Sequence, residues 1–207
     1  MSPISFVKSR GMYPFLVGAV TAVFLIPILI SLTGLPKLQQ YAGYEWIVIP
    51  LLPVLFLVGY QVGLLLFGKR AVMREIMRFA LIGLSNFAVD TGSNLTLLSF
   101  IPVVTSSDPI FWTVNALGVS VAIGNSFFWN RLWTFGEVKQ NQENTLIKFL
   151  IVSIGAIVIN TTVVSVALKL LYVANFPSYA IPTVKVMATV VSMTWNFVGY
   201  KYLVFKK

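Results

Sequence analysis

The sequence predicts an all-α integral membrane protein with six transmembrane helices. Of its 207 residues, 57% are hydrophobic and only 10% are charged. A soluble domain carries about 25% charged residues to cover its surface, and a disordered chain is far less apolar. Six apolar segments have the roughly 20 residues that a bilayer-spanning helix needs. They are residues 13–34, 46–67, 78–102, 110–130, 147–172 and 179–200.

The first segment follows Lys8 and Arg10, a pattern that a cleaved signal peptide shares. Its apolar stretch is longer than that of a typical signal peptide, and no small-x-small cleavage site follows it cleanly. We therefore interpret it as an uncleaved helix. With the second segment it forms a predicted N-terminal two-helix transmembrane hairpin, residues 1–70, that stands apart from the rest of the chain.

The third to sixth segments form an internal repeat at an offset of 70 residues. The sequence RFALIG at 78–83 matches KFLIVS at 148–153, and SFFWNRLWTF at 126–135 matches NFVGYKYLVF at 196–205. Residues 71–207 are therefore predicted to hold two helical hairpins, with repeats at about 74–135 and 144–205. Each copy contains two spans, so both enter the membrane from the same side, as parallel repeats do.

The distribution of basic residues predicts the orientation. Twelve of the 15 Lys and Arg residues fall on one side of the predicted topology, and that side is cytoplasmic by the positive-inside rule. Both termini are then cytoplasmic. The other three are Lys37, in a loop on the opposite side, and Lys169 and Lys185, near the opposite helix ends. We expect Lys185 to snorkel to the outer interface, with capture of a phosphate there as the alternative.

The composition also excludes much chemistry. The chain has no His and no Cys, so an imidazole base, a thiol nucleophile and the usual zinc ligands are missing. The six acidic residues are scattered along the chain, which does not favour a site for a hard cation. The sequence predicts no catalytic residue, no cofactor and no metal site. The net charge of +9 favours anionic partners, and lipid head groups or phosphates fit better than nucleic acid.

Four basic residues at predicted cytoplasmic helix ends form two repeat-equivalent pairs. Arg78 matches Lys148, and Arg131 matches Lys201. We predict that the four make a basic collar that binds the phosphate of a lipid carrier, while the isoprenoid tail stays in the bilayer. The alternative is ordinary positive-inside topology with generic contacts to anionic lipid.

Asp90 lies near the middle of the third segment, and its repeat counterpart is Asn160. A carboxylate at this depth costs on the order of 3 kcal/mol and indicates function. It would serve as a proton-linked gate or as an acceptor for a sugar hydroxyl; the alternative is a neutral side chain hydrogen-bonded to nearby amides. The predicted intramembrane polar site comprises Asp90, Asn160, Asn86, Asn94, Asn125 and Asn196.

These motifs resemble the GtrA-like family of small multi-span membrane proteins. The resemblance covers about residues 74–207 and depends on Arg78-Phe79, on Ser126 to Phe135 and on Asn196 to Phe205. Family members usually have four spans, so residues 1–70 depart from the pattern. Lys201 also stands where Arg is common, and Lys lacks the bidentate fork of Arg.

The resemblance implies a role in cell-surface polysaccharide or glycolipid assembly at the cytoplasmic (inner) membrane. The leading hypothesis is translocation of a polyprenyl-phosphate-linked sugar. The alternative is a non-transporting anchor or scaffold for a polyprenyl-phosphate glycosyltransferase, docked through residues 131–147 or 1–70. A proton-coupled exporter of small cations using Asp90 is a third hypothesis, and an enzyme comes last. The implied partners are an anionic glycolipid and a membrane-associated glycosyltransferase; a homo-oligomer is left open, and no nucleic acid is expected.

Overall fold

A computed structural model of the protein describes residues 11–101, 109–136, 144–173 and 180–205. Within these ranges the chain forms long α-helices and no strand, which confirms the predicted all-α class. Lys8, Arg10 and residues 137–143 of the polar connector at 131–147 lie outside the described residues. The helices are α2 (Tyr13–Thr33), α3 (Val48–Phe67), α4 (Ala71–Phe100), α5 (Pro109–Trp129), α6 (Thr145–Val173) and α7 (Ala180–Gly199).

Among the described residues, four helical segments are long and apolar enough to cross a bilayer: Tyr13–Thr33, Glu45–Phe67, Pro109–Thr134 and Thr145–Ala167. The chain is therefore a multi-pass membrane protein, while six spans and cytoplasmic termini stay predictions. The third predicted segment differs in its start, because α4 begins at Ala71 rather than at residue 78. The helical turns before residue 78 contain the charged residues Arg74 and Glu75. Charged residues are compatible with a helix, but they end the apolar segment by which a span is predicted.

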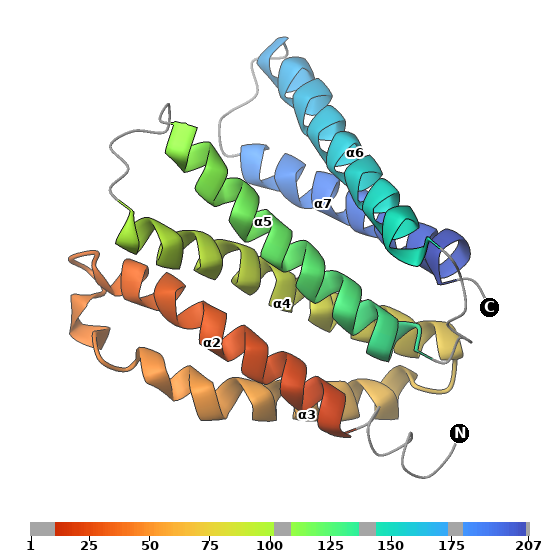
Figure 1. Ribbon diagram of the computed structural model, residues 1–207, viewed down its shortest axis with the longest axis horizontal. Helices are drawn as coiled ribbons and strands as arrows, with labels where there is room; N and C mark the ends of the chain where they lie inside the picture. Colours follow the sequence, from red (N-terminus) through yellow and green to blue (C-terminus); the bar gives the residue numbers. More distant parts are fainter. Residues whose placement is uncertain (1–10, 102–108, 137–143, 174–179, 206–207) are drawn as a thin grey trace. The chain divides into compact units, whose positions relative to one another are not determined.

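Contacts divide the chain into two units, residues 1–136 and 137–207. This division falls between the two predicted repeats, so the predicted hairpin 1–70 shares a unit with the first repeat. Unit 1 holds α2 to α5, with α2 packed against α3 and α4, and α4 packed against α5 (Figure 1). Unit 2 holds α6 and α7, which pack against each other as a hairpin.

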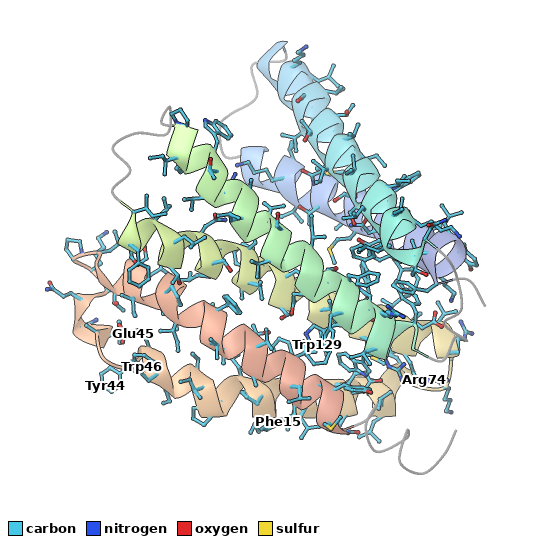
Figure 2. The ribbon with its side chains drawn as sticks, in the orientation of Figure 1. Phe15, Tyr44, Glu45, Trp46, Arg74 and Trp129 are labelled. Carbon is cyan, nitrogen blue, oxygen red and sulfur yellow. The ribbon has the colours of Figure 1, made fainter. Side chains whose placement is uncertain are left out.

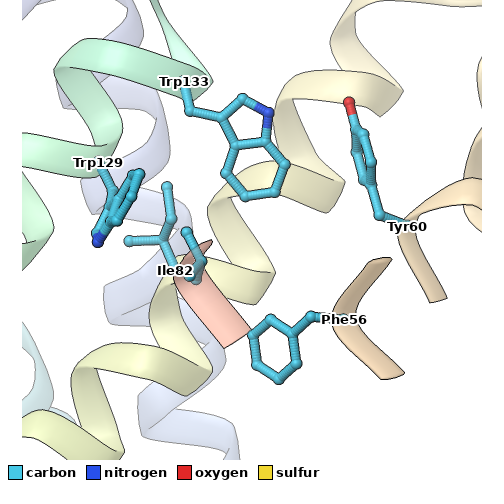
Figure 3. Close-up of a cluster of buried hydrophobic side chains, with 6 residues drawn as sticks. Phe56, Tyr60, Ile82, Trp129 and Trp133 are labelled. Atoms are coloured by element: carbon cyan, nitrogen blue, oxygen red, sulfur yellow. The ribbon is translucent and has the colours of Figure 1, made fainter. Parts of the chain in front are cut away.

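The core of unit 1 is a cluster of apolar and aromatic side chains contributed by every helix of the unit. It comprises Val17, Phe56, Tyr60, Ile82, Trp129 and Trp133 (Figure 3). On α4 the buried residues recur three or four positions apart, as one face of a helix requires; they are Glu75, Arg78, Ile82, Ser85, Ala88, Val89, Gly92 and Ser93. The buried face of α4 is thus partly polar, while large apolar residues such as Leu65 and Phe100 are exposed. This distribution fits a lipid surrounding.

Aromatic residues mark the turn between α2 and α3, at the opposite end of unit 1 from Arg74 (Figure 2). Tyr44 and Trp46 are exposed there, as in an interfacial aromatic belt. Glu45 is buried between them, and its carboxylate accepts hydrogen bonds from the Thr33 hydroxyl and the Gly43 amide, both 2.7 Å long. Gly43 has φ of +92°, a conformation that favours glycine. The acid therefore closes the turn.

A short π-helical turn follows the second helix of each predicted repeat. The turn η4 (Asn130–Thr134) follows α5, and η5 (Tyr200–Val204) follows α7. In each turn a phenylalanine amide donates to the carbonyl five residues earlier, Phe135 to Asn130 at 2.9 Å and Phe205 to Tyr200 at 2.7 Å. The two turns lie 70 residues apart, so the structure reproduces a local feature at the offset found in the sequence.

Two glycines permit close approach of the helices in unit 1. A Cβ atom on Gly92 of α4 would overlap the Phe24 carbonyl of α2. A Cβ atom on Gly18 of α2 would lie 2.8 Å from the Leu52 carbonyl oxygen of α3. Small residues at such crossings are typical of helix packing in membranes.

We predict that Gly92→Ala lowers the free energy of unfolding by about 1–3 kcal/mol, because α2 and α4 have to move apart. Thermal unfolding in detergent measures the change. Gly124→Ala is the matched control, since a Cβ atom on Gly124 meets nothing within 4 Å. Equal stabilities for the two variants would show that α2 and α4 do not approach as closely as described.

Candidate functional site

Polar side chains connect α4 and α5 in the middle of unit 1. The Asn125 side-chain amide of α5 donates to the Asn86 side-chain oxygen of α4 at 2.7 Å and lies 3.4 Å from the Ser85 hydroxyl. Ser85 is completely buried. These contacts bring together Asn86 and Asn125, two of the predicted polar residues, and add Ser85 to them.

A second polar group surrounds Asp90, one helical turn further along α4. The Asn94 amide donates to the Asp90 carboxylate at 3.0 Å and to the Asp90 carbonyl at 3.0 Å, and it lies 3.4 Å from the side-chain oxygen of Asn115 on α5. The Asn94 side-chain oxygen is buried and has no hydrogen-bond partner in the described structure. Gly118 leaves room for this amide, because a Cβ atom there would lie 2.6 Å from the Asn94 nitrogen. The site therefore has one acid, two amides and an unused acceptor.

The remaining predicted polar residues lie in unit 2. Asn160 of α6 donates to the Ser192 hydroxyl of α7 at 3.3 Å. The side-chain oxygen of Asn196, also on α7, is buried without a hydrogen-bond partner in the part of the chain that the structure describes. Asn160 is the repeat counterpart of Asp90, and in the described structure its side chain forms a hydrogen bond with this serine. The polar residues are thus concentrated in the first repeat.

The four predicted collar residues have different surroundings. Arg78 is only 5% exposed, and its Nε donates to the Tyr60 hydroxyl at 2.8 Å while Nη1 donates to the Trp133 carbonyl at 3.0 Å. Its counterpart Lys148 is exposed. Two of the Arg78 donors thus have partners within unit 1, and its contact with a phosphate stays a prediction.

Arg131 and Lys201 have matching surroundings in the two π-helical turns. The Arg131 guanidinium lies 5.8 Å from the centre of the Phe127 ring, and the Lys201 ammonium lies 5.7 Å from that of Phe197. Both distances are in the range of a cation–π contact, and both cations are half-buried. Arg78 and Arg131 belong to unit 1, and Lys148 and Lys201 to unit 2, so a single collar of four stays a prediction.

Sequence reasoning did not select several residues that the structure places at these sites. Tyr60 and Trp133 accept hydrogen bonds from Arg78, and Ser85 lies beside Asn125. Asn115 contacts Asn94, and Ser192 accepts a hydrogen bond from Asn160. Asn115 and Asn125 are ten residues apart on α5, which places them roughly 80° apart around the helix. Their spacing alone therefore does not predict that both face α4. Nothing in the sequence distinguished Tyr60 from other interfacial tyrosines.

The side chains of these groups can form hydrogen bonds with a bound molecule. Amides and a carboxylate offer donors and acceptors that suit hydroxyl groups. In the described part of the chain, no group of three or more acidic residues could hold a metal ion. The arrangement therefore fits the recognition of a polar, uncharged group within the membrane.

The family profile described as "GtrA/DPMS, transmembrane domain" matches residues 78–205, more than half of the chain. The chain belongs to this family. One relative is the uncharacterized membrane protein YngA of Bacillus subtilis (strain 168), which is 26% identical over 133 residues, covering 64% of this chain and 80% of YngA. No solved structure matches the chain. The predicted GtrA-like resemblance is confirmed, and the GtrA/DPMS family indicates a membrane protein of glycosyl-lipid biosynthesis.

In this GtrA/DPMS chain, the match begins at Arg78 and ends at Phe205. The matched region includes both π-helical turns and the polar groups around Asn86, Asp90 and Asn160. Helices α2 and α3 lie before it. Tyr60 therefore belongs to a hairpin outside the matched family region and binds the first residue inside it.

We predict that Asn86 and Asn125 are coupled by about 0.6 kcal/mol, the average for side-chain hydrogen bonds between membrane helices. A double-mutant cycle of Asn86→Ala and Asn125→Ala, followed by chemical unfolding in mixed micelles, measures the coupling. Asn86→Ala combined with Ser120→Ala is the control, because the Ser120 hydroxyl bonds only to its own helix at Ala116. Additive effects in both cycles would contradict the contact.

Proposed function

We propose that this protein translocates a polyprenyl-phosphate-linked sugar across the cytoplasmic membrane for the assembly of a cell-surface polysaccharide or glycolipid. The observation that carries the proposal is the polar group of Asp90, Asn94 and Asn115 between α4 and α5. An acid at this position in a membrane helix is costly unless function requires it. Membership of the GtrA/DPMS family supports glycosyl-lipids as the substrate class.

The sugar is the part of such a lipid that the protein has to stabilise inside the membrane. Its hydroxyl groups lose their water in the hydrocarbon region, where each unsatisfied polar group costs several kcal/mol. Asp90 and the buried oxygen of Asn94 accept hydrogen bonds from hydroxyls, and the exposed amide of Asn115 both donates and accepts. We propose that these three side chains replace water around the sugar during its passage.

The phosphate of the carrier has different requirements. It carries negative charge and is stabilised by cations at head-group depth. We propose that Arg131, Lys148 and Lys201 supply that charge on the cytoplasmic side, where the positive-inside rule also places both termini. The isoprenoid tail remains in lipid, against exposed apolar side chains such as Leu84, Phe87 and Phe128. No covalent step is required.

Transport of a fluorescent polyprenyl-phosphate hexose in proteoliposomes tests the proposal. Loss of a charged hydrogen bond costs about 1.5–3 kcal/mol, so we expect Asp90→Asn to slow translocation about tenfold or more. The fraction of lipid that a membrane-impermeant reductant reaches over time gives the rate. Ser120→Ala is the control that keeps the wild-type rate. Equal rates for wild type, Asp90→Asn and Arg131→Ala would contradict the mechanism.

The description of the family as a transmembrane domain favours a second candidate, an anchor for a polyprenyl-phosphate glycosyltransferase. An anchor has no use for an acid between α4 and α5. It therefore predicts co-purification with the enzyme, normal glycolipid synthesis in cells carrying Asp90→Asn, and loss of binding when residues 137–143 are shortened. These results together would favour the anchor over transport.

A further inference from the structure

The hairpin of α2 and α3 reaches the end of α5, where η4 begins. Trp133 of η4 is 1% exposed and lies against the rings of Tyr60 on α3 and Tyr13 on α2, with centroid distances of 5.1 and 6.4 Å. Figure 3 shows Trp133 facing Tyr60, with Trp129 and Ile82 on its other side. A residue of the first repeat is thus covered by two tyrosines from the hairpin.

Hydrogen bonds join two of these elements, α3 and η4, through Arg78 of α4. Its guanidinium donates to the Tyr60 hydroxyl and to the Trp133 carbonyl, at 2.8 and 3.0 Å. Tyr60 therefore contacts η4 directly through its ring and indirectly through Arg78. The two interactions fix both the side chain and the backbone of Trp133.

The turn η4 needs such support more than an ordinary helix end does. Carbonyl groups in a last helical turn have no partner within the helix, and the Trp133 carbonyl obtains one from Arg78. Asn130 is completely buried, and its side-chain oxygen and the Thr134 hydroxyl have no hydrogen-bond partner in the described structure. Buried polar atoms without partners destabilise the conformation that holds them. Other interactions therefore have to keep η4 in its π-helical form.

The equivalent turn in unit 2 is held differently. Tyr200 of η5 stacks on Phe149 of α6 at 4.4 Å, and its hydroxyl lies 2.7 Å from the Ser153 hydroxyl. The counterpart of Trp133 is Leu203, which is 58% exposed, and the counterpart of Arg78 is the exposed Lys148. Within unit 2 the tyrosine comes from the turn itself, whereas in unit 1 it comes from the added hairpin.

We propose that the α2–α3 hairpin is a positioning element that holds η4 in its π-helical form, with Tyr60, Arg78 and Trp133 as the latch. The latch sets the position from which Arg131, two residues before Trp133, extends toward the Phe127 ring. This assigns a role to residues 11–70, which lie outside the matched family region. The proposal does not depend on the transported substrate.

A spin label in each turn tests the latch directly. The chain has no cysteine, so Leu132→Cys in η4 and Leu203→Cys in η5 each give a single labelling site on an exposed residue, one in each π-helical turn. The labelled proteins are studied in lipid nanodiscs by electron paramagnetic resonance. Tyr60→Phe keeps the ring and removes the hydroxyl that Arg78 binds. We expect it to increase the mobile fraction of the label at position 132 and to leave position 203 unchanged.

Tyr200→Phe is the matched control, because it removes the hydroxyl that contacts Ser153 in unit 2. It should increase mobility at position 203 and leave position 132 unchanged. Arg78→Lys keeps the charge but loses the forked donors, so it should reproduce Tyr60→Phe at position 132. Helical circular dichroism and a single monodisperse peak in size-exclusion chromatography establish folding of each variant.

Two results would overturn the proposal. One is an unchanged label at position 132 in Tyr60→Phe and Arg78→Lys. The other is an equal rise in mobility at 132 and 203 in either variant, which would indicate general loosening rather than a latch. Lipid transport gives an independent readout: with a working latch and no transport by wild type, the positioning role stands and the proposed function fails.

Discussion

A buried arginine is the interaction on which the arrangement of unit 1 depends. Arg78 lies among aromatic side chains in a protein with few charges, and its guanidinium has partners on α3 and η4. Breaking a buried charge pair or leaving a buried charge without partners costs about 3–5 kcal/mol. Arg78 therefore makes α3, α4 and η4 depend on one another, and the added hairpin becomes part of the packing of the first repeat.

Close packing of α2 against α3 and α4 makes the contacts around Arg78 and Trp133 possible. Gly18 lets α2 approach α3, and Gly92 lets α2 approach α4. Lipid provides no hydrophobic driving force between helices, so close packing and hydrogen bonds have to hold them together. With α2 fitted between its neighbours, Tyr13 and Tyr60 reach Trp133 from two helices. The glycines at the crossings and the tyrosines of α2 and α3 thus act together.

The sequence allowed the helices to be predicted because each one is a long apolar segment, and the observed bounds differ from the predicted ones chiefly at α4. It also allowed Asp90 and its neighbouring amides to be selected, since polar residues are conspicuous in such segments. The hydrogen-bond partners of these polar residues could not be predicted. Asn94 bonds to Asp90 on its own helix and also lies 3.4 Å from the side-chain oxygen of Asn115 on α5, while Asn86 pairs with Asn125. Side-chain geometry decides these partners, and composition does not encode it.

The π-helical turns and the burial of Arg78 could not be predicted for a related reason. A π-helical turn has no compositional signature, and a basic residue at a helix end has the same sequence pattern whether it faces lipid head groups or a tyrosine. The repeats also diverged at the residues that matter most: Asp90 against Asn160, Arg78 against Lys148, and Trp133 against Leu203. Each difference gives the first repeat the acid, the buried cation or the large ring. The acid, the buried cation and the large ring therefore lie in the unit that also holds α2 and α3, and the second hairpin lacks them at the equivalent positions.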